Sequence, residues 1–266
     1  MGDYLNNMSL ELRDYGFWIL RNSVHRSRDR FYIREHHNES LQYIGFGTGP
    51  MDRNIILAGV LSIYDDSISR WLEDGIGPNR PYEVVNFAGK RIGQSNRATI
   101  KEVFRKDKNT RNAPFFDKTG WHISYNPTID EQLEIVRRTV VPRMNSVMNQ
   151  KDIITLYDEF GDVLNLRGPQ TRRNYIAPYL MLKNYGLASN IIESILEYNR
   201  IVLMKKKDEL DSDAYIQYEH FMNKALSHLY TIETLLQEQN EMKIKAYMDE
   251  MKNKNTALIK HAMVKH

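Results

Sequence analysis

The stretch WHISYNPTIDEQLEIVRRTVVPRMNSVMNQKDIITLYDEFG, residues 121–161, decides the expected fold. Its first five residues have the composition of a strand, and Asn126-Pro127-Thr128 predicts a turn. From Ile129 the apolar residues recur every three or four positions, which marks the buried face of a helix. Pro142 falls inside this helix and should bend or break it, because proline has no amide proton to donate. A second helix is expected to begin at Asp152, which would serve as its N-cap.

The segments upstream of residue 121 predict an α+β fold. Alternating and β-branched runs indicate strands, so the N-terminal part reads as an antiparallel sheet of about five strands flanked by helices. The expected elements before the strand at 121–125 are a helix over 4–15 with Gly16 as its C-cap, a hairpin of 31–35 and 41–46, strands over 55–64 and 82–87, and a short helix capped by Asp65-Asp66-Ser67.

Beyond a boundary near residues 166–170 the pattern is helical throughout, which predicts an α+β domain over 1–166 and an all-helical domain over 167–266. Helices over 175–184 and 187–204 should form a hairpin joined at Tyr185-Gly186, with a break at the charged residues 205–208. Seven residues then alternate spacings of three and four, a seam suited to helix packing: Tyr215, Tyr218, Met222, Ala225, Leu229, Ile232 and Leu236. We favour packing of this seam within the chain over an interface with another subunit, because it lacks the Leu/Ile heptads of a strong zipper.

Composition excludes several classes of protein. The chain has 266 residues, of which 41% are hydrophobic and none is cysteine. A disulfide scaffold, a thiolate zinc site and a cysteine nucleophile are therefore excluded, and the absence of cysteine fits a reducing compartment. The first residues lack the pattern of a signal peptide, and the longest apolar run, which begins at Ile55, is too short to cross a bilayer. We expect a soluble cytoplasmic protein that does not act at a membrane.

The basic residues are unevenly distributed and form the strongest candidate binding surface. The net charge is only +3, yet residues 90–111 hold eight Lys and Arg residues against two acidic ones, and residues 21–34 are rich in arginine. Such segments are typical either of a solvated loop or, where they are interleaved with aromatic residues, of a surface that binds nucleic acid or an acidic protein. The predicted binding residues are Arg26, Arg28, Arg30, Arg34, Lys90, Arg91, Arg97, Lys101, Arg105 and Lys106.

Other residue patterns do not predict chemistry. The histidines lack metal-ligand spacing, and His36 and His37 would point to opposite faces of a strand. The pair Asp65-Asp66 is interpreted as a helix cap rather than as catalytic carboxylates. The glycine-rich run 45–50 contains Pro50 and is followed by no lysine, so it does not match a phosphate-binding loop. We therefore assign no catalytic residue, no metal ligand and no cofactor.

The order of several short motifs resembles a bacterial family of small α+β domains that is catalogued as a domain of unknown function. The motifs are Gly16-Phe17, Arg30-Phe31-Tyr32, Gln42–Phe46, Leu61–Tyr64, Arg91-Ile92-Gly93, Trp121 and Val141-Pro142-Arg143. The resemblance covers residues 5–162, and the basic stretch after Gly93 and the helical C-terminal third depart from it. Related small α+β families are similar to immunity proteins of bacterial toxin systems, which implies a role in binding a protein partner.

Three hypotheses follow from these observations. The first is a non-enzymatic, immunity-type or defence-associated protein that occludes a protein partner by shape and charge complementarity. The second is a nucleic-acid-binding protein that uses the basic segments 21–34 and 90–111. The third is an enzyme with an unrecognised site around Arg34, Asp65 and His122. The oligomeric state is left open.

Overall fold

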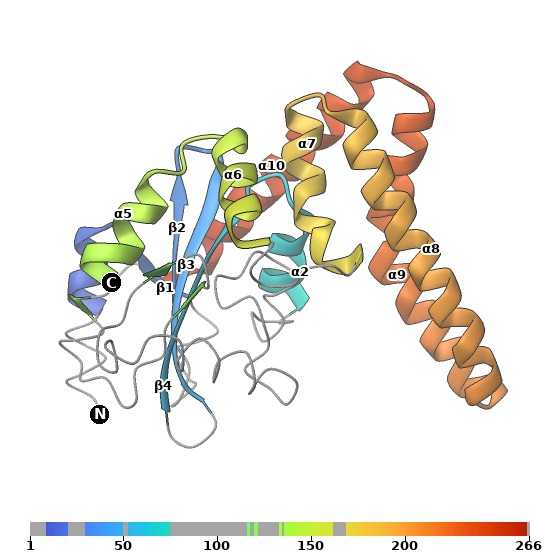
Figure 1. Ribbon diagram of the computed structural model, residues 1–266, viewed down its shortest axis with the longest axis horizontal. Coiled ribbons are helices and arrows are strands. Elements are labelled where there is room, and N and C mark those ends of the chain that lie inside the picture. Colours follow the sequence, from blue (N-terminus) through green and yellow to red (C-terminus); the bar gives the residue numbers. More distant parts are fainter. Residues whose placement is uncertain are drawn as a thin grey trace.

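A computed structural model shows an antiparallel sheet at the centre of the molecule (Figure 1). The structure describes residues 9–20, 30–49, 53–74, 116–117, 120–121, 133–134, 136–161 and 169–264. The strand order of the sheet is β4-β3-β2-β1-β7, and every neighbouring pair is antiparallel. The strands are β1 (Trp18–Leu20), β2 (Arg30–His36), β3 (Ser40–Gly49), β4 (Arg53–Ser62) and β7 (Met263–Val264).

The α+β class and the antiparallel sheet are confirmed, but five strands in the N-terminal part is slightly more than the structure shows. Four strands come from that part, and the short β7 joins from the opposite end of the chain. The hairpin β2–β3 and the strand β4 lie where the alternation predicted them, whereas β1 was not predicted. The expected strand over 82–87 lies outside the described residues. Of the strand at 121–125 the structure describes Trp121, in a separate pair of β5 (Phe116–Asp117) and β6 (Gly120–Trp121).

The hairpin β2–β3 turns at two residues with left-handed backbone. His37 and Asn38 have φ values of 54° and 55°, as expected for the tight turn whose twist matches the strands. The turn brings the rings of His36 and His37 to a centroid separation of 4.1 Å. The expectation that these two side chains point to opposite faces was therefore wrong, because His37 belongs to the turn and not to the strand.

Two glycines in the sheet lie directly beneath aromatic rings. Phe31 pairs with Gly45 across β2 and β3, and Tyr43 pairs with Gly59 across β3 and β4. A Cβ at Gly59 would lie 2.4 Å from the Tyr43 hydroxyl oxygen, and one at Gly45 would lie 2.3 Å from a Phe31 ring carbon. Glycine is thus required at both positions by the close approach of a buried ring.

Helices within the stretch 121–161 cover one face of the sheet. The π-helical turn η3 (Val136–Val140) runs into α5 (Val141–Asn145), and α6 (Gln150–Gly161) follows. Pro142 lies in the first turn of α5, where the helix changes from π to α, so the predicted irregularity at this proline is confirmed. Asn149, not Asp152, caps α6: its side-chain oxygen accepts from the amides of residues 151 and 152. The Asp152 carboxylate reaches back to the amide of Asn149, which completes a capping box.

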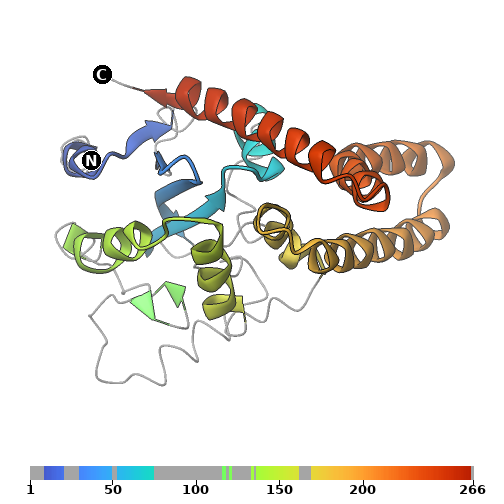
Figure 2. The ribbon, with the colours of Figure 1, turned by 90° about the horizontal axis from the view of Figure 1, so that it is seen from above.

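The opposite face of the sheet is covered by helices from distant parts of the sequence. These helices are α2 (Asp66–Asp74), α7 (Ile176–Met181) and α10 (Glu241–Ala262). Figure 2 shows the sheet between α10 above and α5 with α6 below. The period of two in the strands explains the layering: Tyr32 and Ile44 face the α5–α6 side, while Phe31 and Tyr43 face the core shared with Trp71 and the C-terminal helices.

The C-terminal helices form a hairpin that projects from this body, and we call it the arm. It consists of α8 (Tyr185–Glu209) and α9 (Ser212–Gln237), preceded by the 3₁₀ segment η4 (Pro169–Tyr175). The two helices pack along each other, as the seam predicted. The domain boundary was placed near residues 166–170, of which 166–168 lie outside the described residues. One hydrophobic cluster joins the sheet to α7, α8, α9 and α10.

Two expected irregularities of the arm were wrong. The turn before α8 lies at 182–184, where Lys183 has φ 59°, and Gly186 belongs to the first turn of the helix. The charged run 205–208 does not break α8, which continues to Glu209, because lysine is a good helix former when it is solvated.

Candidate functional site

The turn that joins β4 to α2 carries two carboxylates with different roles. Asp65 caps α2, since its Oδ1 accepts a hydrogen bond from the amide of Ser67 at 2.8 Å, as the sequence predicted. Asn255 of α10 clamps the turn from the other side. Its amide donates to the carbonyl oxygens of Ile63 at 2.7 Å and Asp65 at 2.9 Å, and its Oδ1 accepts from the Ser69 hydroxyl at 2.8 Å.

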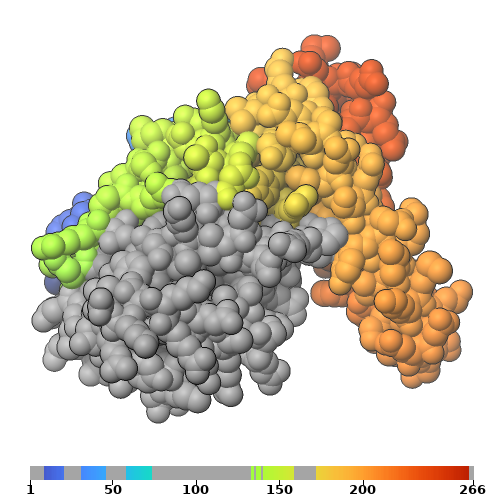
Figure 3. Space-filling model, viewed as in Figure 1, coloured from blue at the N-terminus to red at the C-terminus, as the bar shows by residue number. Residues whose placement is uncertain are grey.

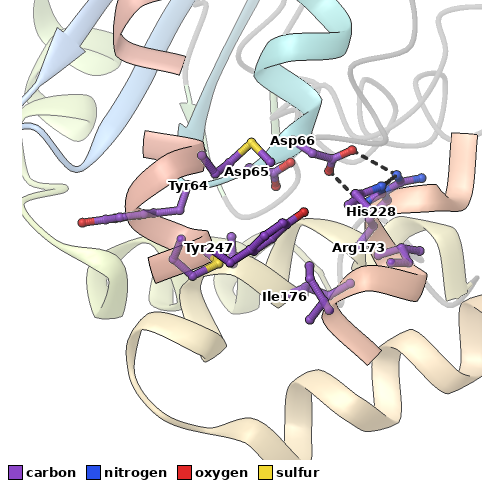
Figure 4. A pocket seen from close by; sticks show the side chains of 12 residues that line it. Tyr64, Asp65, Asp66, Arg173, Ile176, His228 and Tyr247 are labelled. Atoms are coloured by element: carbon purple, nitrogen blue, oxygen red, sulfur yellow. Dashed lines mark hydrogen bonds and ion pairs between the residues drawn. The ribbon is translucent and has the colours of Figure 1, made fainter. Parts of the chain in front are cut away.

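Asp66 is the centre of a charged cluster that joins three elements. Its carboxylate lies 3.1 Å from the Arg173 guanidinium of η4 and 3.1 Å from His228 Nε2 of α9. The Nε of Arg70, one turn further along α2, lies 2.9 Å away. Figure 4 shows Asp66, Arg173 and His228 converging, with Tyr64 extending away from them. We call Asp66, Arg70, Arg173 and His228 the polar joint, because it connects the sheet-bound α2 with the base of the arm.

Arg173 strengthens the connection between the body and the arm. Its guanidinium donates to the carbonyl oxygen of Ala225 on α9 at 3.0 Å and lies 2.9 Å from a ring nitrogen of His228. The side chain is 7% exposed. A buried cation is stable only when its charge is balanced and its donors have acceptors, and Asp66 supplies the balancing charge.

The two adjacent aspartates have pKa values shifted in opposite directions. Burial, followed by the charge of Asp66, raises the pKa of Asp65 from 3.8 to about 6. Burial alone would also raise the pKa of Asp66, but His228, Arg173 and Arg70 hold it well below its usual range. Burial lowers the pKa of His228, and the Asp66 charge opposes that shift. Asp66 is therefore the ionised member of the pair, and Asp65 takes up a proton first.

A cavity of about 20 Å³ adjoins the polar joint, which is room for a single water molecule. Asp65, Asp66, His228 and Tyr247 contribute to its lining. The Oδ2 atom of Asp65 has no hydrogen-bond partner among the described residues. The cavity has room for water but not for a substrate beside the aspartate–histidine pair. The ion pairs of the cluster connect α2, η4 and α9.

Metal binding has no support in the described ranges. Within them no three His, Asp or Glu side chains gather closely enough to hold a metal ion. No helix described by the structure is long and apolar enough to cross a membrane.

Arg34, one of the predicted binding residues, lies in the interior. It is 8% exposed, and its Nε and one of its terminal nitrogens donate to Gln42 Oε1 at 2.9 and 2.7 Å. The guanidinium also donates to the Tyr15 carbonyl oxygen at 2.6 Å and covers the Phe17 ring at 4.4 Å. Burial lowers the pKa of Arg34 to about 10. Its donors fix the sheet to neighbouring segments, so this guanidinium is not presented to a partner.

The structure does not test the rest of the predicted basic surface. Arg30 begins β2, but its side chain lies outside the described part of the structure. The other predicted residues also lie outside it: Arg26, Arg28, Lys90, Arg91, Arg97, Lys101, Arg105 and Lys106. The nucleic-acid hypothesis therefore stays a prediction. Of the residues proposed for an enzymatic site, His122 is likewise outside, and Arg34 and Asp65 bond to different residues and form no common site.

Sequence reasoning missed Arg173 and His228. Arg173 lies in a polar segment without periodicity, and His228 precedes Leu229 of the predicted seam. The sequence offered one indication for His228. It directly precedes Leu229 of the predicted seam, and a residue next to the seam lies near the interface between the helices.

The arm carries the second distinctive feature, a set of exposed apolar side chains. Between residues 200 and 225, all of which the structure describes, no side chain is buried. Seven large apolar residues of α8 and α9 are 43–65% exposed: Leu187, Tyr198, Ile201, Met204, Ile216, Phe221 and Tyr230. Figure 3 shows the outer part of the arm projecting from the body.

No family model, curated protein or solved structure matches this chain.

Proposed function

We propose that this protein is a non-enzymatic cytoplasmic binding protein whose arm docks a protein partner. The observation that carries the proposal is the exposure of several large apolar side chains along α8 and α9, among them Ile201, Ile216 and Phe221. Exposed apolar patches on folded proteins commonly mark sites of interaction with other proteins. The resemblance to immunity-type families covers residues 5–162 and not the arm, and it supports binding of a protein partner as the general role.

The energetics of the arm support this role. A helical hairpin takes most of its stability from the apolar faces that it buries, and isolated helices are marginal in water. The inner half of the arm has that support from buried residues such as Ile192, Ile195 and Leu229. The outer half packs only partly buried residues between its two helices. Full burial of a large apolar side chain contributes about 1.5–3 kcal/mol. These side chains are about half exposed, so covering one would contribute about 1 kcal/mol and several together could hold a partner.

The polar joint suits the same function. Arg173 bonds both to Asp66 on the body and to the backbone of α9, so the arm leaves the body at a defined angle. A docking element held in one orientation loses less conformational entropy when it binds, which favours affinity.

The test is capture of the partner with and without an altered arm. The arm variant replaces Ile201, Ile216, Phe221 and Tyr230 with glutamine, a good helix former, and should cost little stability because these side chains are exposed. A matched control replaces Met242 of α10, which is 80% exposed and lies outside the arm. The tagged wild-type protein should retain a stoichiometric protein from its native cells, identified by mass spectrometry.

Reconstitution from purified components decides the outcome. We expect calorimetry to show binding by the wild type and the Met242 variant and a loss of about tenfold or more in the arm variant. If the wild type and the arm variant bind the partner equally well, the arm is not the docking element. If the wild type retains no stoichiometric protein, the proposed function is refuted.

A further inference from the structure

A surface groove runs along one face of the arm where α8 meets α9. Its floor on α8 includes Leu196 and Leu203, which are seven residues apart and therefore share a helix face. Buried Asn199 lies between them, and its amide donates to the Ile195 carbonyl oxygen at 2.7 Å within the helix. Tyr230 of α9 also lines the groove and is 43% exposed. The groove thus presents an apolar floor with one large aromatic residue.

The rim of this groove is acidic. Three glutamates, Glu193, Glu197 and Glu233, line it, together with the single cation Arg200. Arg200 is bonded to Glu197 at 2.7 Å, and Glu193 accepts a hydrogen bond from Ser189. Glu233 has no ion-pair partner among the described residues. The rim is therefore net negative on a chain whose overall net charge is +3.

We infer that the groove binds a basic amphipathic helix of a protein partner, an inference that rests on the proposed function of the arm. A groove between two helices accepts the apolar face of a third helix, with contacts at positions i, i+3, i+4 and i+7. From Glu193 to Leu203 the groove spans about 15 Å, or about three turns of such a helix. Lysine or arginine residues beside the apolar stripe of the ligand would meet the acidic rim.

Floor and rim contribute differently to recognition. The apolar floor and Tyr230 supply affinity, because buried aromatic and aliphatic contacts dominate binding energy. Exposed ion pairs add little affinity but select the partner and speed association. The net negative rim disfavours nucleic acid, whose phosphates it would repel.

The experiment uses the full chain and two fluorescent peptides, with binding read by fluorescence anisotropy. One peptide is an amphipathic helix of about 14 residues with leucine on one face and lysine elsewhere, and the other carries glutamate in place of lysine. We expect the lysine peptide to bind and the glutamate peptide to bind at least about tenfold more weakly, with a difference that shrinks as salt is added.

Variants then assign the binding to the groove. Glu233→Lys should weaken binding of the lysine peptide by about fivefold and Tyr230→Ala by about tenfold. The control Glu250→Lys changes the net charge equally on an exposed residue of α10 and should leave binding within about twofold of wild type. Circular dichroism confirms that each variant is folded. Equal weakening by Glu233→Lys and Glu250→Lys, or equal binding of both peptides, would overturn the inference.

Failure of this inference is distinguishable from failure of the proposed function. If the arm variant loses the native partner while the lysine peptide does not bind, the arm docks a partner of different chemistry and only the groove assignment fails. If sedimentation shows a dimer that Tyr230→Ala dissociates, the groove holds a second copy of the chain and the inference also fails. If neither the native partner nor the peptide binds, both proposals fail.

Discussion

Replacing Asp66 with alanine should destabilise the protein by about 3–5 kcal/mol, the usual cost of leaving a buried cation without its partner. Asp66 is the carboxylate that balances Arg173, whose side chain is 7% exposed and cannot turn to solvent without breaking its bond to the Ala225 carbonyl oxygen. Arg70, at 25% exposed, can be rehydrated more easily. The cost should therefore come mainly from Arg173 and from the loosened base of the arm.

Urea unfolding followed by the fluorescence of Trp71, on the same helix as Asp66, measures this effect. A control is Asp249→Ala, which removes the exposed ion pair with Lys245 and should cost less than about 1 kcal/mol. The double variant Asp66→Ala with Arg173→Met should recover a large part of the loss, because it removes the unpaired charge as well. The reasoning is refuted if Asp66→Ala costs no more than Asp249→Ala, or if the double variant is no more stable than Asp66→Ala alone.

Two further predictions follow from the glycines and from Asp65. Gly59→Ala should lower the free energy of unfolding by about 2–4 kcal/mol, because the new Cβ would meet the buried Tyr43 ring. Gly186→Ala, which lies in open space within α8, should raise the free energy of unfolding by about 0.5–1 kcal/mol. Chemical denaturation of both variants measures these changes, and changes of the same sign and size in the two variants would contradict the reasoning. The pKa of Asp65 is raised from 3.8 to about 6 in the folded state. Protonated Asp65 therefore stabilises the folded protein at low pH, and this contribution to the free energy of unfolding is lost as the pH rises to about 6. The unfolding free energy of Asp65→Asn relative to wild type should accordingly rise by up to about 3 kcal/mol between about pH 4 and pH 7, and a difference that does not change with pH would exclude this assignment.

Elements that depend on neighbouring residues were predictable from the sequence. The hairpin β2–β3 follows from alternation and a polar turn, and the cap at Gly16 is confirmed by its φ of 80°. The irregularity at Pro142 follows from one missing amide proton. The short strand β1 was not predictable, because its three residues become a strand by pairing with β2 and with β7 from the far end of the chain.

The polar joint could not be predicted because its members are far apart in sequence. Asp66 was correctly placed at the start of a helix, but 107 residues separate it from Arg173, and nothing near either residue indicates the pairing. The burial of Arg34 could not be predicted either, because its acceptors come from other segments of the chain. Its arginine-rich neighbourhood predicted a surface, yet Gln42 and Asn145 supply acceptors that allow its burial.

The sequence by itself determined the class of fold, the strands of the hairpin, the caps at Gly16 and Asp65 and the seam of the arm, because periodicity and capping act over a few residues. The tertiary structure decided which charged groups are buried and which apolar side chains remain exposed. A charge becomes internal when distant segments bring it a partner, as they do for Asp66 and Arg34. An apolar residue such as Phe221 stays exposed when no other segment of the folded chain covers it, and this exposure on the arm is the basis for the proposed function.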